Sequence, residues 1–360
     1  MSTIGIAIVG CGGISLQNHL PGLTLCKDVR VTALCDSNPA TLEVARQQTG
    51  CSVTSTSYEE IVRRDDVQAV IIATPNATHA PVALAAIEAG KHVLCEKPLG
   101  MSAVEVKAMA DAADKADVRH LTAFTYRFVP AMRYLHHLVK RGDLGTPHHY
   151  RSCRLQDWGT RNVGWRQQKR LAGTGEIGDM LSHRIDFAHH LVGPMKRLVA
   201  NLMTLTPVRG GQPNDTDDWV AILAEFKSGA SGVLESSKLA SGVNESWRSP
   251  DRVEINGSEA SFSFTTGAWG ELQFGKIGGP GLTSLPVPRE FWTWPGSPRD
   301  PQQGDPLVTF RYDQAFEFID AIRNQRPCAV TFHDGLRMQE VTDAAVKSAQ
   351  TKQWVELESL

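Results

Sequence analysis

The sequence predicts an α/β protein with a parallel sheet in its first third and an antiparallel sheet in the remainder. Across residues 1–122, short apolar runs alternate with helical patterns, which is typical of a doubly wound parallel sheet. From about Pro147, apolar residues instead alternate with polar ones, which indicates strands with one solvated face. A chain of 360 residues is long enough for two domains. We therefore assign 1–122 to the first domain and 123–360 to the second, whose closing helices are candidates for packing back on the first.

Composition and charge exclude several classes of partner. The net charge is −2, so we expect neither a nucleic acid nor an anionic membrane as partner. No apolar run approaches the ~18 residues that cross a bilayer, and a strand pattern begins at Ile4 with no signal peptide before it. The seven cysteines are scattered, with no C-x-x-C pair, which is typical of reduced thiols. We therefore expect a cytoplasmic protein.

A glycine-rich turn follows the first apolar run. Gly10 permits a tight turn, Gly12 lets a phosphate approach the backbone, and Gly13 and Ile14 lead into a helical pattern. The free N–H groups at the start of such a helix attract a dinucleotide pyrophosphate. Ser15 occupies the third motif position, where glycine or alanine is usual. The turn predicts dinucleotide binding, and the alternative is a structural turn that binds no ligand.

An acidic residue supports the first interpretation and distinguishes two cofactors. Asp36 follows the second apolar run, 21 residues after Ser15, where a carboxylate binds the adenosine ribose. It would accept hydrogen bonds from both ribose hydroxyls and would repel a 2′-phosphate. Neither Ser37 nor Asn38 provides an arginine that neutralises such a phosphate. The sequence therefore predicts NAD rather than NADP, with Asp36 and Ser37 at the ribose.

Three further stretches lie where strands of the parallel sheet are expected to end. Ligands of such sheets bind beyond the carboxyl ends of the strands. The stretches are Thr74-Pro75-Asn76 with His79, Glu96-Lys97-Pro98, and Tyr126-Arg127-Phe128. Lys97 can hold a substrate hydroxyl there and exchange a proton if its pKa is lowered. The alternative is an ordinary surface lysine at a turn.

The second domain contains a helical stripe of charged residues. On a helix over 177–191, Asp179 and His183 lie one turn apart on the same face, and Asp186 and His190 continue it. A carboxylate in that position orients a histidine base or stabilises its charged form. A solvated polar face and a divalent metal site are the alternatives. We expect no metal.

A basic stretch with two tryptophans, residues 154–170, precedes that helix. Its five basic side chains accompany one acidic side chain, and Trp158 and Trp165 lie between them. Binders of single-stranded nucleic acid have a similar composition, but the near-neutral chain argues against that function. A solvated loop or a subunit contact is one interpretation. The other is a platform for a sugar, on which Arg161, Arg166 and Lys169 bind a charged substituent.

Together these motifs resemble the glucose–fructose oxidoreductase, inositol dehydrogenase and rhizopine-catabolism (Gfo/Idh/MocA) family over nearly the full length. The shared motifs are Ala7-Ile8-Val9-Gly10-Cys11-Gly12-Gly13-Ile14, Ala73-Thr74-Pro75-Asn76 with His79, Glu96-Lys97-Pro98, and residues 173–186, which are similar to G-G-G-x-x-x-D-x-G-x-H-x-x-D. The resemblance implies an N-terminal Rossmann domain and a C-terminal α/β domain with an open, mostly antiparallel sheet. It also implies a homo-oligomer, a dimer or tetramer, formed through that sheet.

The resemblance further implies a reaction and its residues. The reaction is hydride transfer from a secondary alcohol of a sugar, glycoside or cyclitol to NAD, with Lys97, Asp179 and His183 as the catalytic set. The implied cofactor-binding residues are Gly10, Gly12, Gly13, Ile14, Asp36, Ser37, Thr74, Pro75, Asn76, His79, Glu96 and Lys97. The implied substrate-binding residues are Tyr126, Arg127, Trp158, Arg161, Trp165, Arg166, Asp179 and His183.

Other branches of the family define the alternative functions. One branch cleaves glycosides, here including anionic ones, by transient oxidation with NAD, and another binds NAD and a sugar as a non-catalytic sensor. Retention of Lys97 and His183 argues against the sensor. Thr174 and Leu181 stand where the family often has glycine, so we expect a substrate pocket of different shape.

Overall fold

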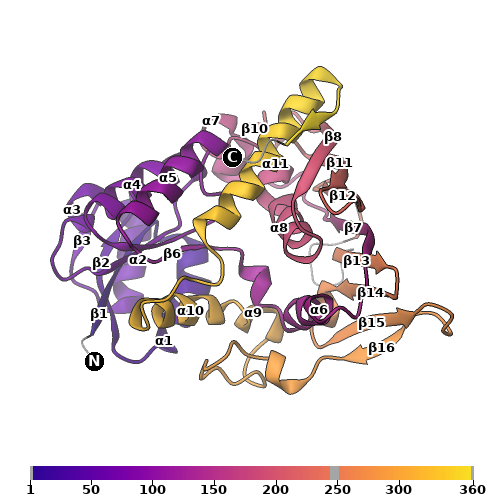
Figure 1. Ribbon diagram of the computed structural model, residues 1–360. Helices are drawn as coiled ribbons and strands as arrows, with labels where there is room; N and C mark the ends of the chain where they lie inside the picture. Colours follow the sequence, from indigo (N-terminus) through magenta and orange to yellow (C-terminus); the bar gives the residue numbers. More distant parts are fainter. Residues whose placement is uncertain (1–2, 244–250, 358–360) are drawn as a thin grey trace. The chain divides into compact units, whose positions relative to one another are not determined.

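The computed structural model describes residues 3–243 and 251–357, and its elements are labelled in Figure 1. The chain divides into two compact units. The first comprises residues up to 125 together with 293–336, and the second comprises 126–292 together with residues from 337 onward. From sequence we assign 293–336 to the second domain, with closing helices as candidates for packing back on the first, and in the structure this segment belongs to the first unit. Within the described ranges, no helix is both long and apolar enough to cross a membrane.

The first unit contains the predicted parallel sheet. Its six strands are all parallel, in the order β3-β2-β1-β4-β5-β6. They are β1 (Ile4–Val9), β2 (Val29–Cys35), β3 (Thr54–Ser55), β4 (Ala69–Ile72), β5 (His92–Cys95) and β6 (His120–Thr122). The strand order reverses between β1 and β4, so the crevice that binds ligands in such sheets lies at the carboxyl ends of these two strands. The predicted doubly wound fold is confirmed.

Two apolar layers cover the faces of this sheet, because successive strand residues point to opposite sides. Ile6 and Ile8 join one core cluster, which includes Phe318 of the closing segment. Ala7 and Val9 join the other cluster. The helices of this unit are α1 (Leu20–Thr24), α2 (Pro39–Thr49), α3 (Tyr58–Val62), α4 (His79–Glu88), α5 (Ala103–Lys115), α9 (Pro306–Thr309) and α10 (Tyr312–Arg323). Burial of Phe318 and its neighbours on α10 explains why the chain returns to the first unit.

The second unit contains a nine-stranded sheet in the order β16-β15-β14-β13-β7-β12-β11-β8-β17. Neighbouring strands are antiparallel except β7 and β12, which are parallel. The strands are β7 (Pro147–Leu155), β8 (Met195–Met203), β11 (Trp219–Phe226), β12 (Ser231–Ser237), β13 (Asp251–Gly257), β14 (Ala260–Thr265), β15 (Glu271–Lys276), β16 (Thr283–Pro286) and β17 (Val355–Glu356). A separate hairpin joins β9 (Val208–Arg209) to β10 (Gln212–Pro213). The predicted mostly antiparallel sheet is confirmed.

The two faces of the large sheet differ. On the covered face, the buried Tyr150 of β7 donates a hydrogen bond to the Arg184 carbonyl of α8 at 3.0 Å. On the other face, Leu223 is 45% exposed, and Val199 and Val233 flank it in register on β8 and β12. The helices of this unit are α6 (Pro130–Arg141), α7 (Lys169–Ala172), α8 (Ser182–Leu191) and most of α11 (Phe332–Thr351).

Candidate functional site

The glycine turn after β1 has the space that a phosphate site needs. Gly10 adopts a φ of +92°, and a Cβ there would lie 2.5 Å from the Ala73 carbonyl, so only glycine fits. A Cβ at Gly12 would meet no atom of the described chain within 4 Å, which leaves the backbone open to a ligand. Ser15, which departs from the usual motif, donates a hydrogen bond from its hydroxyl to the Gly10 carbonyl at 2.6 Å. The serine therefore closes the turn. Gly13 and Ile14, which precede it, already lie in the helical segment.

Asp36 lies beside this turn, just after β2. One carboxylate oxygen accepts a hydrogen bond from the Cys11 N–H at 2.7 Å, and the other accepts from the Asn38 N–H at 2.8 Å. The carboxylate is half-buried, whereas Ser37 and Asn38 are exposed. The Asn38 side chain accepts a hydrogen bond from the Ala40 N–H and caps α2. The structure thus brings the predicted ribose carboxylate onto the glycine turn.

His79 links the ends of β4 and β5. Its ring nitrogens lie 2.9 Å from the Thr74 carbonyl oxygen and 2.8 Å from the Pro98 carbonyl oxygen. Burial lowers the pKa of His79, and the two carbonyl contacts oppose that shift. A neutral ring carries one N–H, so it donates to one of these carbonyls at a time. Pro75 and the buried Asn76 lie between Thr74 and His79, where a one-turn helix begins.

Glu96 is paired with a histidine that no sequence motif indicated. His19 Nε2 lies 2.9 Å from Glu96 Oε1, and the two side chains are 2% and 16% exposed. Burial alone would raise the pKa of Glu96, but the hydrogen bond and charge of His19, with Lys97 and His79, lower it overall. His19 ends a wide π-helical turn, Ser15–His19, that directly follows the glycine motif. Lys97 follows Glu96 at the strand end and is half-buried.

In the second unit, the predicted helix is divided into a π-helical turn, Ile177–Leu181, and α8. Asp179 lies in the wide turn, and His183 lies in the first turn of α8. His183 is only 4% exposed, and the Tyr126 ring packs edge-on against it with a centroid distance of 4.6 Å. The structure therefore brings together Tyr126 and His183, two of the predicted substrate-binding residues.

Arg127 and Asp186 neutralise each other. The guanidinium donates two hydrogen bonds to the carboxylate, from Nε at 2.8 Å and from Nη2 at 2.5 Å, and both side chains are nearly buried. Such a bidentate pair restrains both partners. Further along α8, His190 stacks on His136 of α6 with a centroid distance of 3.6 Å. The far half of the predicted stripe thus connects α6, α8 and the Tyr126 segment. In residues 3–243 and 251–357, no group of three side chains has the arrangement of a metal site.

A buried lysine outside every sequence motif contacts Asp179. Lys238 Nζ lies 3.2 Å from Asp179 Oδ2 and 3.3 Å from Glu176 Oε2, and its side chain is 3% exposed. Burial would lower the pKa of Lys238, but Asp179, Glu176 and Asp217 raise it overall. Burial raises the pKa of Glu176 to about 7, opposed by Lys238 and reinforced by Asp179. Lys238 directly follows β12, and strand periodicity does not mark such a residue as buried.

The basic loop contacts the same carboxylate through Arg166. Arg166 Nε lies 3.9 Å from Asp179 Oδ1, and its guanidinium stacks over the Trp165 ring at 4.4 Å. The Arg166 side chain is 44% exposed, so its outer edge faces solvent. Arg161 lies over the Trp158 ring at 5.7 Å. The structure thus brings Arg166, but not the whole basic stretch, to Asp179.

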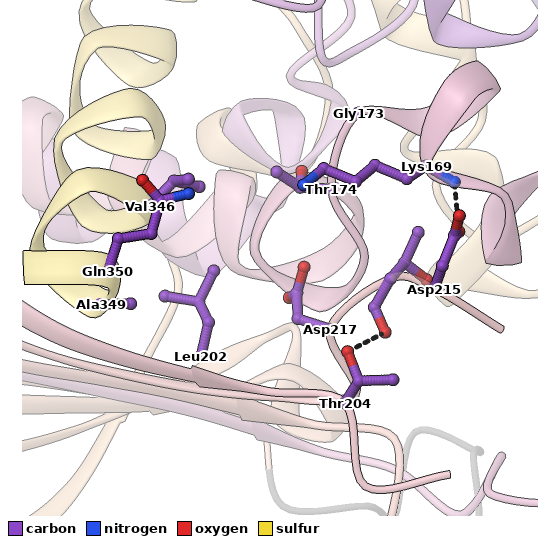
Figure 2. Close-up of a pocket in the computed structure, with 11 residues that line it drawn as sticks. Lys169, Gly173, Thr174, Leu202, Thr204, Asp215, Asp217, Val346, Ala349 and Gln350 are labelled. Atoms are coloured by element: carbon purple, nitrogen blue, oxygen red, sulfur yellow. Dashed lines mark hydrogen bonds between the residues drawn. The ribbon is translucent and has the colours of Figure 1, made fainter. Parts of the chain in front are cut away.

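A cavity of about 230 Å³ adjoins the segment that leads to Asp179 (Figure 2). Its lining comes from the 169–174 segment, β8, the 215–217 segment and α11. Lys169, the third predicted cation, borders this cavity, and its backbone N–H donates to Asp215 at 2.5 Å. Thr174 also borders the cavity, whereas the other departure from the family pattern, Leu181, is fully buried. Of these two departures, Thr174 therefore contributes to the shape of this cavity, whereas Leu181 lies in the protein interior.

Asp217 connects this cavity to the segment that leads into the π-helical turn Ile177–Leu181. Its carboxylate accepts hydrogen bonds from the Gly175 N–H at 2.5 Å and from the Ile177 N–H at 2.9 Å. A Cβ at Gly175 would lie 2.0 Å from the Asp217 carbonyl oxygen, so the close approach requires glycine. Burial raises the pKa of Asp217, and its backbone hydrogen bonds oppose the shift.

Two family models match the chain. One, described as an oxidoreductase family with an NAD-binding Rossmann fold, matches residues 4–124, and the other, the C-terminal alpha/beta domain of that family, matches residues 136–357. The levoglucosan dehydrogenase of Pseudarthrobacter phenanthrenivorans is 32% identical over 351 residues, which cover 90% of this chain and 88% of that protein. The myo-inositol 2-dehydrogenase of Thermotoga maritima is 26% identical over 99% of each chain.

Solved structures are similar over both units. A levoglucosan dehydrogenase in complex with NADH and levoglucosan has a TM-score of 0.90 at 30% identity, over 99% of this chain and 100% of that one. An oxidoreductase domain protein from Kribbella flavida has a TM-score of 0.90 at 31% identity over 100% of each chain. Fold and sequence similarity thus extend along the same length of chain.

The position of Asp36 predicts which dinucleotide binds more tightly. We expect NAD to bind at least about tenfold more tightly than NADP, because a 2′-phosphate would meet the Asp36 carboxylate. Asp36→Asn should weaken NAD about tenfold, as expected for loss of a hydrogen bond to a charged group. Calorimetric titration of both nucleotides measures this, with the exposed Asp65→Asn as control. Tighter binding of NADP by the wild-type protein would contradict the role of Asp36.

Proposed function

Because the chain belongs to the Gfo/Idh/MocA family of oxidoreductases, we propose that it oxidises a secondary alcohol of a sugar, glycoside or cyclitol, with NAD as hydride acceptor. The observation that carries this proposal is the buried His183, packed by Tyr126 and preceded on its helical segment by the charge-paired Asp179. The names of the similar levoglucosan and myo-inositol dehydrogenases support the substrate class.

The residues of the first unit fit NAD. The open space at Gly12 admits a pyrophosphate, and the Asp36 carboxylate beside the turn suits a ribose with free hydroxyls. The Thr74 hydroxyl is buried and has no hydrogen-bond partner within the described chain, which makes it a candidate for the cofactor as well. When bound, NAD accepts the hydride from the substrate carbon.

We assign the proton transfer to His183. As hydride leaves the carbon, the imidazole accepts the proton of the substrate hydroxyl, and a carbonyl forms. Asp179, one helical turn earlier, stabilises the imidazolium that results. Because His183 is almost inaccessible to solvent, this charge interaction is stronger than it would be in water.

We assign stabilisation of the substrate oxygen to Lys97. Its ammonium donates a hydrogen bond to that oxygen as negative charge develops on it. The neighbouring Glu96, restrained by its 2.9 Å contact with His19, fixes the strand end from which Lys97 extends. The contacts of His79 with the Thr74 and Pro98 carbonyls fix the same strand end from the other side of Lys97.

An anionic substituent on the substrate is a more specific proposal. Arg166 lies over the Trp165 ring at 4.4 Å, with 44% of its side chain exposed and with a 3.9 Å contact to Asp179. A guanidinium held in this way presents a planar edge that suits a carboxylate or phosphate. Arg161 on Trp158 repeats the arrangement in the same loop. These contacts support a charged substrate but are also compatible with a neutral sugar that stacks on the tryptophans.

We propose further that the uncovered face of the large sheet joins subunits in a homodimer or homotetramer. Val199, Leu223 and Val233 form an apolar row across three neighbouring strands. Beside this row, Arg197 and Glu225 pair through two hydrogen bonds of 2.7 Å. An apolar centre with a polar margin is typical of a subunit interface.

A cytoplasmic location also fits the chain. All seven cysteines are free, six of them are buried, and Cys153 is partly exposed. Cytosolic conditions keep such thiols reduced. A fractionation of the native host that placed the protein outside the cytoplasm would contradict this location.

The catalytic assignment predicts the kinetics of two variants. His183→Ala and Lys97→Met should each lower kcat roughly a hundredfold or more, because each removes a group that acts in the transition state. Both should still bind NAD, since the glycine turn and Asp36 are unaltered in both, although Lys97 belongs to the implied cofactor-binding set. The exposed His148→Ala and Lys115→Met are matched controls that should leave kcat unchanged. Near-wild-type turnover of either site variant would show that its assigned role is wrong.

The same assay separates the three functions. A panel of sugars, cyclitols and aryl glycosides is incubated with the protein and NAD, and both NADH and released aglycone are measured. The proposed dehydrogenase accumulates NADH together with an equal amount of ketone. Release of aglycone without net NADH would instead identify a glycosidase that oxidises its substrate transiently. Binding of NAD and sugar without conversion of any panel member would identify a sensor.

The contact between Arg166 and Trp165 predicts charge-dependent specificity. Arg166→Met should raise KM for an anionic sugar about tenfold or more, because a charge-assisted bidentate contact is lost, and should change KM for the neutral analogue little. Steady-state kinetics on the matched pair measure the difference. Arg170→Met removes another exposed cation of the same loop and is the control. Equal losses on both substrates, or none on either, would remove the case for charge recognition.

The apolar row on the sheet predicts the effect of a charge at its centre. Leu223→Asp should dissociate the oligomer, because a buried carboxylate without a partner destabilises an interface. Analytical ultracentrifugation measures the mass. Leu282→Asp, at a site 46% exposed compared with 45% for Leu223, should leave the mass unchanged. A wild-type protein that sediments as a monomer would contradict the proposed contact.

A further inference from the structure

The strongest feature outside the family motifs is the group of buried charges around Asp179. We propose that Lys238 and Glu176 are positioning residues for this carboxylate, in which the Lys238 ammonium keeps Asp179 ionised while Glu176 carries a proton. The inference rests on the proposed function, because it concerns the carboxylate assigned to support His183.

The first argument is the balance of charge. One ammonium lies between two carboxylates, at 3.2 Å from Asp179 and 3.3 Å from Glu176, and a third carboxylate, Asp217, is buried nearby. The Glu176 side chain is completely buried and Lys238 is 3% exposed, so water does not compensate an excess negative charge. A single buried ammonium does not fully neutralise two carboxylates, so the arrangement favours a proton on one of them, although the partly exposed Arg166 also faces Asp179.

The second argument identifies which carboxylate carries this proton. The buried Ser236 hydroxyl oxygen lies 3.0 Å from the Arg154 carbonyl oxygen and 2.5 Å from Glu176 Oε1. The Ser236 hydroxyl donates to Glu176 Oε1. Glu176 is completely buried, whereas Asp179 is 16% exposed and also faces Arg166, so burial favours the proton on Glu176 rather than on Asp179. Burial is the largest cause of the raised pKa of Glu176, and the charge of the lysine ammonium and the hydrogen bond from Ser236 oppose it.

The third argument is that the backbone of Lys238 is fixed at both its N–H and its carbonyl. Its backbone N–H donates to the Asp218 carbonyl at 2.9 Å, and its own carbonyl accepts from the Trp158 N–H at 2.8 Å. Arg209, buried and paired with Asp218, also donates to the Trp158 carbonyl at 2.6 Å. The residue that holds Asp179 is therefore also fixed to the loop that begins at Trp158.

Several charged residues face the pair in the described part of the chain. Asp179 is faced by Lys238 after β12, by Glu176 on its own turn, and by Arg166 of the basic loop. Glu176 is faced in addition by Asp217. Without Lys238, Asp179 would lose its buried counter-charge, which favours uptake of a proton by this carboxylate. The imidazolium of His183 would then lose its counter-charge.

The first experiment measures the ionisation of His183 directly. In NAD-saturated protein labelled with ¹⁵N-histidine, His183 is assigned from the His183→Ala spectrum and titrated by NMR. Lys238→Met should lower the pKa of His183 by about one unit, as expected for loss of a nearby opposite charge. Lys238→Arg should restore most of the shift, and the exposed Lys276→Met should produce none. An unchanged or higher pKa in Lys238→Met would overturn the proposal.

Kinetics supply the second part of this experiment. If the protein oxidises a sugar, Lys238→Met should lower kcat at least about tenfold, with KM changed less than about threefold, because the lysine does not touch the substrate. The histidine titration requires no substrate, so it remains decisive even if the proposed reaction is wrong.

The second experiment tests the proton on Glu176 and does not require Lys238→Met to fold. Since the pKa of Glu176 is raised to about 7 in the folded chain, the protonated form stabilises the fold at low pH. This contribution is complete below the unfolded pKa of about 4.3 and is lost as pH rises through about 7. The unfolding temperature of Glu176→Gln minus that of the wild type is therefore expected to be larger at pH 8 than at pH 5. A difference that does not depend on pH would show that Glu176 is ionised throughout.

Discussion

The close approach of Asp217 to Gly175 is the constraint on which the second unit's site depends. The Asp217 carboxylate binds the N–H groups on both sides of Glu176, and its carbonyl oxygen leaves no room for a Cβ at Gly175. The turn that follows is therefore held at its start. It places Glu176 inside the protein and Asp179 at the edge of solvent, with His183 beginning the next helix. Contacts with the backbone of this turn thus decide where the charges of Glu176 and Asp179 lie.

Buried ion pairs divide the charged residues of this unit into two groups. Arg127 with Asp186 and Arg209 with Asp218 are fully engaged with each other. Such pairs contribute little net stability, but they restrain the segments that carry them. Arg166 belongs to the second group, because its side chain remains exposed on the Trp165 ring. The basic stretch 154–170 contains both kinds of residue, because Arg154 is buried and paired with Asp251 at 3.2 Å whereas Arg166 remains exposed.

Sequence patterns predicted the architecture well, because periodicity reflects local geometry. Apolar runs identified the strands of the parallel sheet, and alternation identified most strands of the second sheet. The return of α10 to the first unit was only a possibility at that level, since an amphipathic helix does not reveal which surface covers its apolar face. Similarly, Ser15 departs from the usual glycine motif, yet its hydroxyl closes the turn.

The sequence by itself determined the parallel and antiparallel sheets, the glycine turn with Asp36, and the candidate set of Lys97, Asp179 and His183, because each depends on residue type at a short spacing. Only the tertiary structure decided which charges surround Asp179. Lys238 follows a strand 59 residues after Asp179, and it contacts that carboxylate because the sheet brings the end of β12 against the turn. His19 likewise reaches Glu96 across 77 residues. Contacts between distant segments arise from packing, and no local pattern encodes them.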